Sequence, residues 1–416
     1  MRRRLACLLV PILWGLSGST SGQIARLLEQ VPAGLGVDIH FTAPKAGEME
    51  MLAAGGFTWV RTDLSWRATE PAPGVYDFTR YDGLWTALAA QHVSAILTLD
   101  YGNPLYDGGW APHTDTGRAA FAAWAQAAVS HFRGRPVLWE LYNEPNTGFW
   151  KPAPNVSDYI RLAKLVGPAI HAADPTAVFI GPATSGFDFT FLDACFQAGL
   201  LQEWSAVTVH PYRSSGPETA SADYQRLRML IAQHVTDRQI PILSGEWGYS
   251  TSTPGIDEAQ QGNLLARQWL SNLMNGVPLS IWYDWRDDGP PGSSSAQAHY
   301  GTVLQPYLPG TQPVFSPKPA YFAAQVLTAT LYGFQFSRRL PTASQSDFVL
   351  EFKKHDGTKR YALWTTGPPH PLQVSDLQGS FQWISVDGHT NGSLPATTGQ
   401  GIEVEVQAAP VYLIPN

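Results

Sequence analysis

Hydrophobic positions along the chain fall into short apolar runs that alternate with longer segments in which apolar residues recur every three or four positions. Short continuous apolar runs are typical of strands buried on both faces, and the longer spacing is typical of helices with one buried face. This alternation repeats eight times. The predicted strands begin near Leu35, Thr58, Ser94, Val137, Ala177, Ala206, Ile240 and Leu279.

The segments between these runs have the length and spacing of crossover helices. The clearest predicted helices span 116–132, 157–173, 222–234, 257–275 and 318–332. Successive strands start 23 to 43 residues apart, which accommodates one strand, one helix and their loops. Eight such units predict an α/β fold, a (β/α)8 barrel. The alternative is a doubly wound open sheet, but the Gly-rich phosphate turn that often follows its first strand is missing here.

The segment after Tyr332 has a different pattern. Helical spacing disappears, and short apolar runs are separated by Gly, Pro, Asp and Asn. The strands predicted in it are 348–352, 360–365, 381–386, 402–406 and 410–414. We therefore predict a small antiparallel β-sandwich domain over residues 333–416, packed against a barrel domain over residues 23–332.

The first 22 residues form a separate pattern. Three arginines precede the apolar run from Leu5 to Leu16, and residues 17–22 are small and polar. This order is typical of a secretion signal. The apolar run is short of the about 20 residues that span a bilayer, although an uncleaved anchor is an alternative. We expect a secreted, periplasmic or cell-surface protein without a membrane span after cleavage of the signal.

Composition and charge narrow the choice of partners. Of 416 residues, 44% are hydrophobic and 15% charged, so the chain can bury a large core. The net charge of −7, without a basic stripe, argues against a nucleic-acid partner. The 15 Trp, 16 Tyr and 18 Phe fit a cleft that stacks on sugars. Without the signal, Cys195 is the single cysteine, which we expect as a buried thiol in a monomer.

Polar residues at the strand ends suggest chemistry, because the carboxyl ends of barrel strands converge on one mouth. The fourth strand is followed by Asn143 and Glu144, and the seventh ends at Glu246. Two carboxylates on opposite walls suit cleavage of a glycosidic bond. Glu140 lies four residues before Glu144, about 13 Å deeper at the rise of an extended strand. We therefore predict Glu140 as a buried core carboxylate outside the site.

These residues carry a resemblance to a known group of enzymes. The pattern Trp139-Glu140-Leu141-Tyr142-Asn143-Glu144-Pro145-Asn146, followed by Gly245-Glu246-Trp247-Gly248, resembles the clan of retaining glycoside hydrolases with a (β/α)8 barrel. It is most similar to the β-xylosidase-like and cellulase-like branch with an attached β-sandwich. The resemblance covers about Gly34 to Tyr332. It implies that Glu144 is the acid/base, that Glu246 is the nucleophile and that Asn143 contacts the sugar 2-hydroxyl.

The resemblance also implies a supporting set of residues. Arg61 corresponds to the arginine near the nucleophile, His210 and Tyr212 to the pair that orders the site, and Trp285 to the aromatic floor, with Trp282 as its alternative. Arg61 and Tyr212 would favour the charged form of Glu246. We expect the negative charge of Glu246 to raise the pKa of Glu144 until the glycosyl ester removes that charge.

The remaining sequence signals concern binding and alternatives. Loop residues expected as sugar platforms at the same mouth are Tyr101, Asn103, Trp110, Trp150 and Trp247. The acidic run at 284–288 lacks the spacing of a calcium loop, and no zinc-hydrolase, serine-elbow or P-loop motif occurs, so we expect no metal and no cofactor. The sequence predicts a secreted retaining glycosidase that cleaves β-linkages of a neutral poly- or oligosaccharide. The alternatives are a non-catalytic carbohydrate-binding protein on the same barrel and an acyl hydrolase, which would need a serine nucleophile.

Overall fold

The computed structural model describes residues 30–397, 399 and 401–416, so the predicted signal at residues 1–22 lies outside the described part. Eight parallel strands close into a barrel in sequence order, with the last paired to the first. The strands are β1 (Leu35–Asp38), β2 (Trp59–Ser65), β3 (Ser94–Asp100), β4 (Val137–Leu141), β5 (Val178–Ser185), β6 (Ala206–His210), β7 (Ile242–Trp247) and β8 (Ser280–Trp282). The predicted barrel is confirmed, and each strand begins within two residues of its predicted start.

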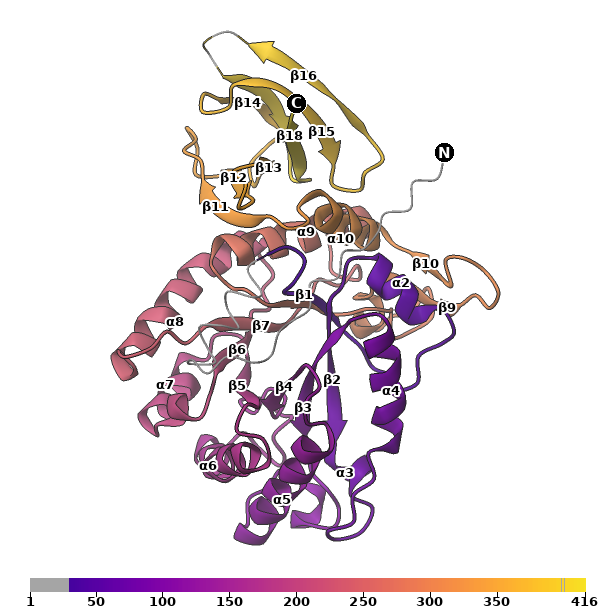
Figure 1. Cartoon of the computed structure of the whole chain (residues 1–416), viewed down its shortest axis with the longest axis vertical. Helices are drawn as coiled ribbons and strands as arrows, with labels where there is room; N and C mark the ends of the chain where they lie inside the picture. The colour runs from indigo at the N-terminus through magenta and orange to yellow at the C-terminus, as the bar shows by residue number, and fades with distance from the viewer. Residues whose placement is uncertain (1–29, 398, 400) are drawn as a thin grey trace.

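Helices on the outside of the barrel connect successive strands (Figure 1). They are α2 (Glu48–Ala54), α3 (Trp66–Thr69), α4 (Thr79–Ala90), α5 (Asp115–His131), α6 (Val156–Ala173), α7 (Phe189–Gln197), α8 (Ala220–His234), α9 (Glu258–Met274) and α10 (Pro319–Thr330). Several helices are preceded by a residue whose side chain accepts a hydrogen bond from a backbone N–H of the first turn. Examples are Thr114 before α5 and Asp257 before α9. Such caps satisfy N–H groups that have no partner within the helix. The predicted thiol Cys195 is buried in α7.

The interior of the barrel has two layers. An apolar cluster includes Trp59 on β2, Ile96 on β3 and Leu138 on β4. Because alternate residues of a strand point to the same side, the next inward positions toward the carboxyl ends are Arg61, Thr98 and Glu140. Polar side chains therefore lie between the apolar layer and the mouth.

A second domain follows α10. Six strands form one antiparallel sheet and two form a smaller sheet, and a hydrophobic cluster lies between them, as predicted for a β-sandwich. The six are β11 (Gln335–Arg339), β12 (Asp347–Lys353), β13 (Lys359–Thr365), β18 (Val411–Pro415), β15 (Gly379–Ser385) and β16 (Asn391–Thr397); the two are β14 (His370–Val374) and β17 (Ile402–Val406). A hairpin of β9 (Val303–Tyr307) and β10 (Phe315–Pro317) precedes α10.

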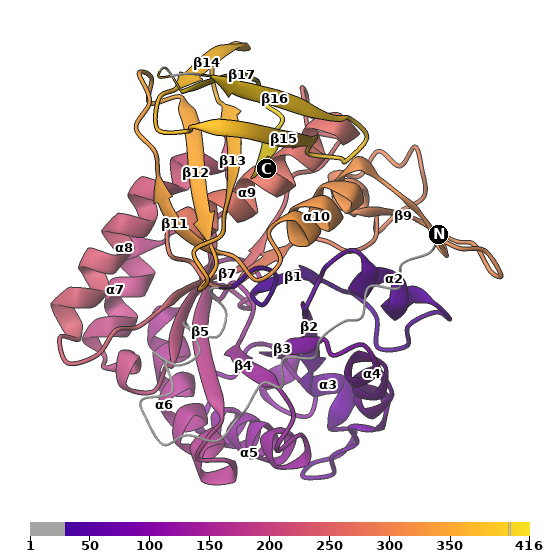
Figure 2. The same cartoon turned by 45° about the horizontal axis from the view of Figure 1, so that its top comes forward.

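The sandwich packs on the barrel beside α9 and α10 (Figures 1 and 2). The largest hydrophobic cluster contains residues of both parts, including Trp269 of α9 and Phe348 and Trp364 of the large sheet. The indole N–H of Trp364 donates to Glu218 at 2.7 Å, and Glu218 accepts two hydrogen bonds from Arg267 of α9. Barrel and sandwich therefore share one core.

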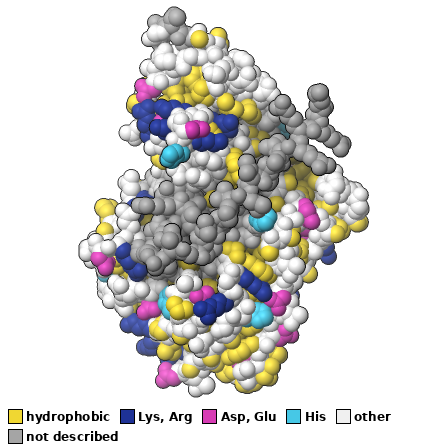
Figure 3. Space-filling view, viewed as in Figure 1, with side chains coloured by type: hydrophobic (Ala, Val, Ile, Leu, Met, Phe, Trp, Pro, Cys, Tyr) yellow, Lys and Arg dark blue, Asp and Glu magenta, His cyan; other side chains and the backbone are white. Residues whose placement is uncertain are grey.

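The visible surface is mixed in character. On the face in Figure 3, Lys and Arg gather on the C-terminal domain near its junction with the barrel, while charges of both signs are scattered over the barrel. Among the residues that the structure describes, none of the helices combines the length and apolar character needed to cross a bilayer.

Candidate active site

Arg61 connects four side chains at the mouth of the barrel. Its guanidinium donates to Glu140 at 2.7 Å, to Asp38 at 3.0 Å, to Glu246 at 2.9 Å and to Asn143 at 2.8 Å. Its side chain is only 3% exposed. Burial disfavours the charge of Arg61, but the surrounding carboxylates raise its pKa well above the usual range. One cation thus ties together strands β1, β2, β4 and β7.

Glu246 is held at both carboxylate oxygens. Arg61 donates to Oε2, and the hydroxyl of Tyr212 donates to Oε1 at 2.8 Å. Burial and the charge of Glu246 raise the pKa of Tyr212, so its hydroxyl keeps its proton and remains a donor. Both partners stabilise a carboxylate anion.

Glycine precedes Glu246 for a steric reason. A Cβ at Gly245 would lie 3.1 Å from Oε1 of Glu140 and 3.4 Å from Nε2 of His210. The first distance is tighter than ordinary van der Waals contact. The absence of a side chain at Gly245 lets these two buried groups approach β7.

The backbone at Glu144 has an unusual conformation. Tyr142 has φ 64° and Glu144 has φ 44°, in the left-handed region that non-glycine residues rarely adopt. The N–H of Glu144 donates to Ala183 at 3.0 Å, and its carbonyl accepts from the Thr147 N–H and hydroxyl at 2.9 Å each. Surrounding hydrogen bonds maintain this strained geometry, as is common at functional sites.

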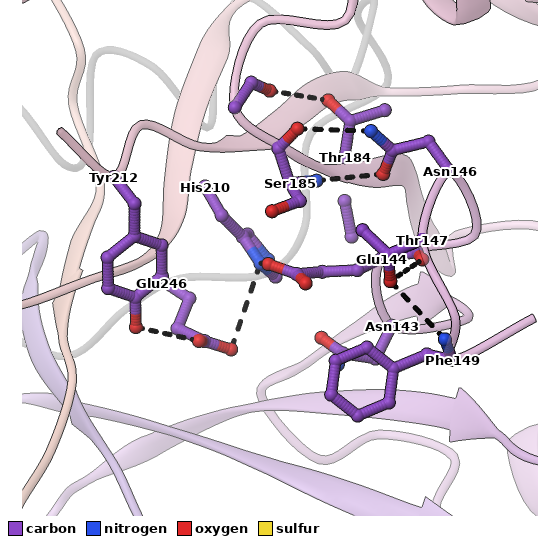
Figure 4. A network of polar contacts seen from close by, with 12 residues as sticks. Asn143, Glu144, Asn146, Thr147, Phe149, Thr184, Ser185, His210, Tyr212 and Glu246 are labelled. Atoms are coloured by element: carbon purple, nitrogen blue, oxygen red, sulfur yellow. Dashed lines mark hydrogen bonds and ion pairs between the residues drawn. The ribbon is translucent and has the colours of Figure 1, made fainter. Parts of the chain in front are cut away.

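His210 lies between the two glutamates (Figure 4). Its Nδ1 is 3.0 Å from Oε1 of Glu144 and 3.8 Å from Oε2 of Glu246, and its side chain is fully buried. Burial opposes a charged imidazole, but the charge of Glu246 and the hydrogen bond to Glu144 raise the pKa of His210. One carboxylate oxygen of Glu144 and one of Glu246 lie within 4.8 Å of each other.

The prediction that the pKa of Glu144 is raised is wrong for the free protein. Burial raises it, but the hydrogen bond and charge of His210 outweigh burial and hold the pKa of Glu144 below its ordinary value. The raised pKa was predicted from the charge of Glu246 alone, without the effect of the His210 imidazole. These opposite shifts favour the imidazole as the site of the proton in the hydrogen bond between His210 and Glu144.

The predicted position of Glu140 is also wrong. Glu140 is fully buried, as expected, but it shares Arg61 with Glu246 and accepts a hydrogen bond from Thr98 at 3.0 Å. The predicted depth of about 13 Å holds only for a strand that stays extended from Glu140 to Glu144. In the structure β4 ends at Leu141, and the left-handed residues that follow turn the chain.

Trp285 does not form the floor of the site. It is fully buried, its indole N–H donates to Glu48 at 3.1 Å, and its ring packs edge-on against Phe57. The alternative, Trp282, is also fully buried, with its N–H donating to the carbonyl of Tyr300. Both rings belong to the core.

The predicted loop platforms differ in their placement. Asn103 is buried and donates to the carbonyl of Glu70, and Trp247 and Trp150 are buried, so these three are structural. Trp110 is 49% exposed. Tyr101 is half-buried, stacks on Phe149 and interacts with Asn143, a predicted site residue.

Sequence reasoning missed two aromatic residues near the nucleophile. Tyr283 follows β8 directly and packs with Tyr300 and Tyr212, at centroid distances of 5.2 Å and 6.5 Å. Its place directly after β8 is a signal that could have identified Tyr283, because residues after the barrel strands face the mouth. Tyr300 lies in an irregular loop with no periodic signal.

Within the described part of the chain, two groups of side chains have ligand atoms close enough to hold a metal ion. One is Glu144, His210 and Glu246, and the other is His40, Asp284 and Asp288. His40 Nδ1 is 2.9 Å from Asp288. Burial disfavours its charge, but this hydrogen bond and the nearby aspartates raise the pKa of His40 to about 10. A protonated imidazole therefore already supplies a cation to the second group.

Comparison with known sequences places the chain among glycoside hydrolases. A β-xylosidase of Geobacillus stearothermophilus is 32% identical over 110 residues, a segment that covers 24% of this chain and 21% of that protein. The aligned part thus spans about a fifth of that relative.

Solved structures share the whole fold. A family 39 glycoside hydrolase from Bacteroides cellulosilyticus superposes with a TM-score of 0.80 at 24% identity, covering 94% of this chain and 82% of that chain. A β-xylosidase of the same family from Caulobacter crescentus gives 0.66 at 19% identity, covering 94% and 97%. Barrel and sandwich therefore occur together in these proteins. Residues 35–289, more than half of the chain, match the profile of the cellulase family, glycosyl hydrolase family 5, and the chain belongs to this family.

Proposed function

We propose that this protein is a retaining glycoside hydrolase that cleaves β-linkages of a neutral poly- or oligosaccharide by double displacement. The observation that carries the proposal is the approach of a Glu144 oxygen and a Glu246 oxygen within 4.8 Å. Retaining enzymes hold their two carboxyl groups about 5–5.5 Å apart, and inverting enzymes about 6.5–9.5 Å apart to admit a water.

In the first step, a Glu246 oxygen attacks the anomeric carbon while the bond to the leaving oxygen breaks. That oxygen takes the proton shared by His210 and Glu144, delivered through the carboxyl of Glu144. Asn143 uses its amide oxygen to accept from Arg61, which leaves its NH2 group to donate to the sugar 2-hydroxyl. A neutral amide adds no charge beside an oxocarbenium-like transition state.

In the second step, water attacks the anomeric carbon of the glycosyl ester and gives a proton to Glu144. The ester bond breaks and Glu246 regains its charge. Because the ester carries no charge, His210 loses the neighbour that most strongly favours its protonated form. Loss of that charge lowers the proton affinity of the pair, so Glu144 stays unprotonated and is free to take the proton from water, as the base role requires.

The nucleophile assignment is tested with Glu246→Ala on aryl β-glycosides. Turnover should fall by at least about 10⁴-fold, and azide should restore part of it by forming the α-glycosyl azide. The anomeric configuration of the first product of the unmodified enzyme, read by NMR, is the second measurement. A first product of inverted configuration would exclude double displacement.

Secretion and the monomeric state are part of the same proposal. The basic, apolar and small-polar order of residues 1–22 supports removal of a signal. Mass spectrometry of the protein exported by its host should find an N-terminus after about residue 22. Light scattering should give the mass of one chain.

A further inference from the structure

A pair of carboxyl groups lies next to the Arg61 network and has no role in the steps above. Asp63 is two residues after Arg61 on β2, and Asp100 is the last residue of β3. Alternate residues of a strand share a side, so Asp63 points inward as Arg61 does. Asp100 points inward as Thr98 does, whose hydroxyl donates to Glu140 inside the barrel. In the strand register Asp63 lies opposite Thr98.

Asp100 has no donor to satisfy its charge. It is fully buried, and within the described ranges neither of its carboxyl oxygens has a hydrogen-bond donor. The carboxyl of Asp63 is close enough to act on it, and a hydrogen bond between the two carboxyl groups requires a proton on one of them. Burial and the charge of Asp63 raise the pKa of Asp100 well above its ordinary value. This shift favours the protonated form of Asp100, whose O–H can donate to Asp63.

Asp63 is accessible to solvent from the barrel mouth. It is the one exposed residue of β2, where the inward neighbours Trp59 and Arg61 are buried. Burial nevertheless raises its pKa, and Arg61, His40 and Glu246 act on its charge. The groups that act on its charge come from β2, from the end of β1 and from β7, so Asp63 faces the same mouth as Glu246.

We propose that Asp63 is a sugar-binding residue that accepts a hydrogen bond from a hydroxyl of the glycone, the sugar that Glu246 attacks. Asp100 is a positioning residue, because its O–H fixes one side of the Asp63 carboxylate and leaves the other side free for the sugar. The inference rests on the proposed glycosidase function. It makes the site selective for a sugar with a hydroxyl at that position and unfavourable for a carboxylate there, since like charges repel.

The experiment uses aryl β-glycosides that the full-length enzyme cleaves, together with analogues that each lack one ring hydroxyl. The unmodified enzyme should lose about 10- to 100-fold in kcat/KM on the analogue that lacks the bound hydroxyl, as for one hydrogen bond to a charged group. Asp63→Ala should show a similar loss of kcat/KM on the parent glycoside. For this variant, removing the same hydroxyl from the substrate should lower kcat/KM little further. Asp237→Asn, in the exposed loop between α8 and β7, is the control with unchanged kinetics.

The role of Asp100 has its own pair of variants. Asp100→Asn keeps an N–H donor toward Asp63 and should retain kcat/KM within about threefold. Asp100→Ala should raise KM and weaken the discrimination between the parent and the deoxy analogue. Thermal unfolding midpoints show whether each variant is folded.

The outcomes separate the two proposals. If the unmodified enzyme cleaves no glycoside, the proposed function fails. If it cleaves them and Asp63→Ala discriminates among the deoxy analogues as the unmodified enzyme does, Asp63 contacts no sugar hydroxyl and this inference alone is overturned. A glycoside with a carboxylate in place of the bound hydroxyl should be cleaved more slowly by the unmodified enzyme than by Asp63→Ala.

Discussion

Nδ1 of His210 lies 3.0 Å from Oε1 of Glu144, and the imidazole is fully buried between Glu144 and Glu246. This contact lowers the pKa of Glu144 and raises that of His210, so the two residues titrate as one unit. The proton needed for departure of the leaving group belongs to the pair.

Replacing His210 by Gln should change the pH dependence of catalysis. In the unmodified enzyme the last proton of the pair leaves at the raised pKa of the imidazole. In His210→Gln the carboxyl of Glu144 holds that proton alone, so the alkaline limb of the kcat/KM profile should move to lower pH. An alkaline limb at the original pH would show that His210 does not share the proton.

Replacing Glu144 by Ala should affect substrates according to their leaving groups. A poor leaving group needs protonation, so kcat/KM should fall by about 10²–10⁴-fold. A dinitrophenyl glycoside should be attacked by Glu246 almost as fast as before. Azide should then yield the β-glycosyl azide, the opposite anomer to that from Glu246→Ala. An equal loss on all leaving groups would contradict the acid role.

Replacing Arg61 by Met should destabilise the protein as well as inactivate it. The change leaves Asp38, Glu140 and Glu246 without their shared cation in a buried site. Removing one partner of a buried ion pair costs about 3–5 kcal/mol of unfolding free energy. Arg61→Lys keeps the charge but not the forked geometry. Its free energy of unfolding in denaturant should therefore lie between that of the unmodified protein and that of Arg61→Met. Unchanged stability of Arg61→Met would contradict a structural role for this network.

Removing the sandwich should leave the barrel insoluble. A chain that ends at Tyr332 lacks Phe348 and Trp364, which belong to the same hydrophobic cluster as barrel residues. The single change Trp364→Ala should reduce the unfolding free energy by about 3–5 kcal/mol. Met229→Ala, at a side chain that is 62% exposed, is the control for a large apolar residue outside the core. A soluble and active truncated barrel would contradict the shared core.

The regular part of the fold was predictable because strand and helix periods differ. The eight strand starts, five of the helices and the change of pattern after Tyr332 follow from apolar spacing alone. Three sandwich strands were missed. His370 and Pro371 interrupt the apolar run of β14, β11 is rich in polar residues, and β16 contains Gly392 and Pro395 and few apolar residues.

The candidate site was predictable where regular strands carry the side chains. Arg61, Asn143, His210, Tyr212 and both glutamates lie together because the carboxyl ends of parallel strands meet at one mouth. The prediction for Trp285 failed because irregular backbone after β8 sets the direction of its side chain, which spacing does not encode. The prediction for Trp247 failed because its side chain, on the last residue of β7, is buried. The Asp63 and Asp100 pair escaped notice because its significance depends on a missing donor, which only three-dimensional packing reveals.

The shared core has a consequence for anyone who recombines such enzymes. The sheet after α10 cannot be exchanged as a cassette, because its barrel-facing surface and the outer surface of α9 must be replaced together to keep their interlocking shapes.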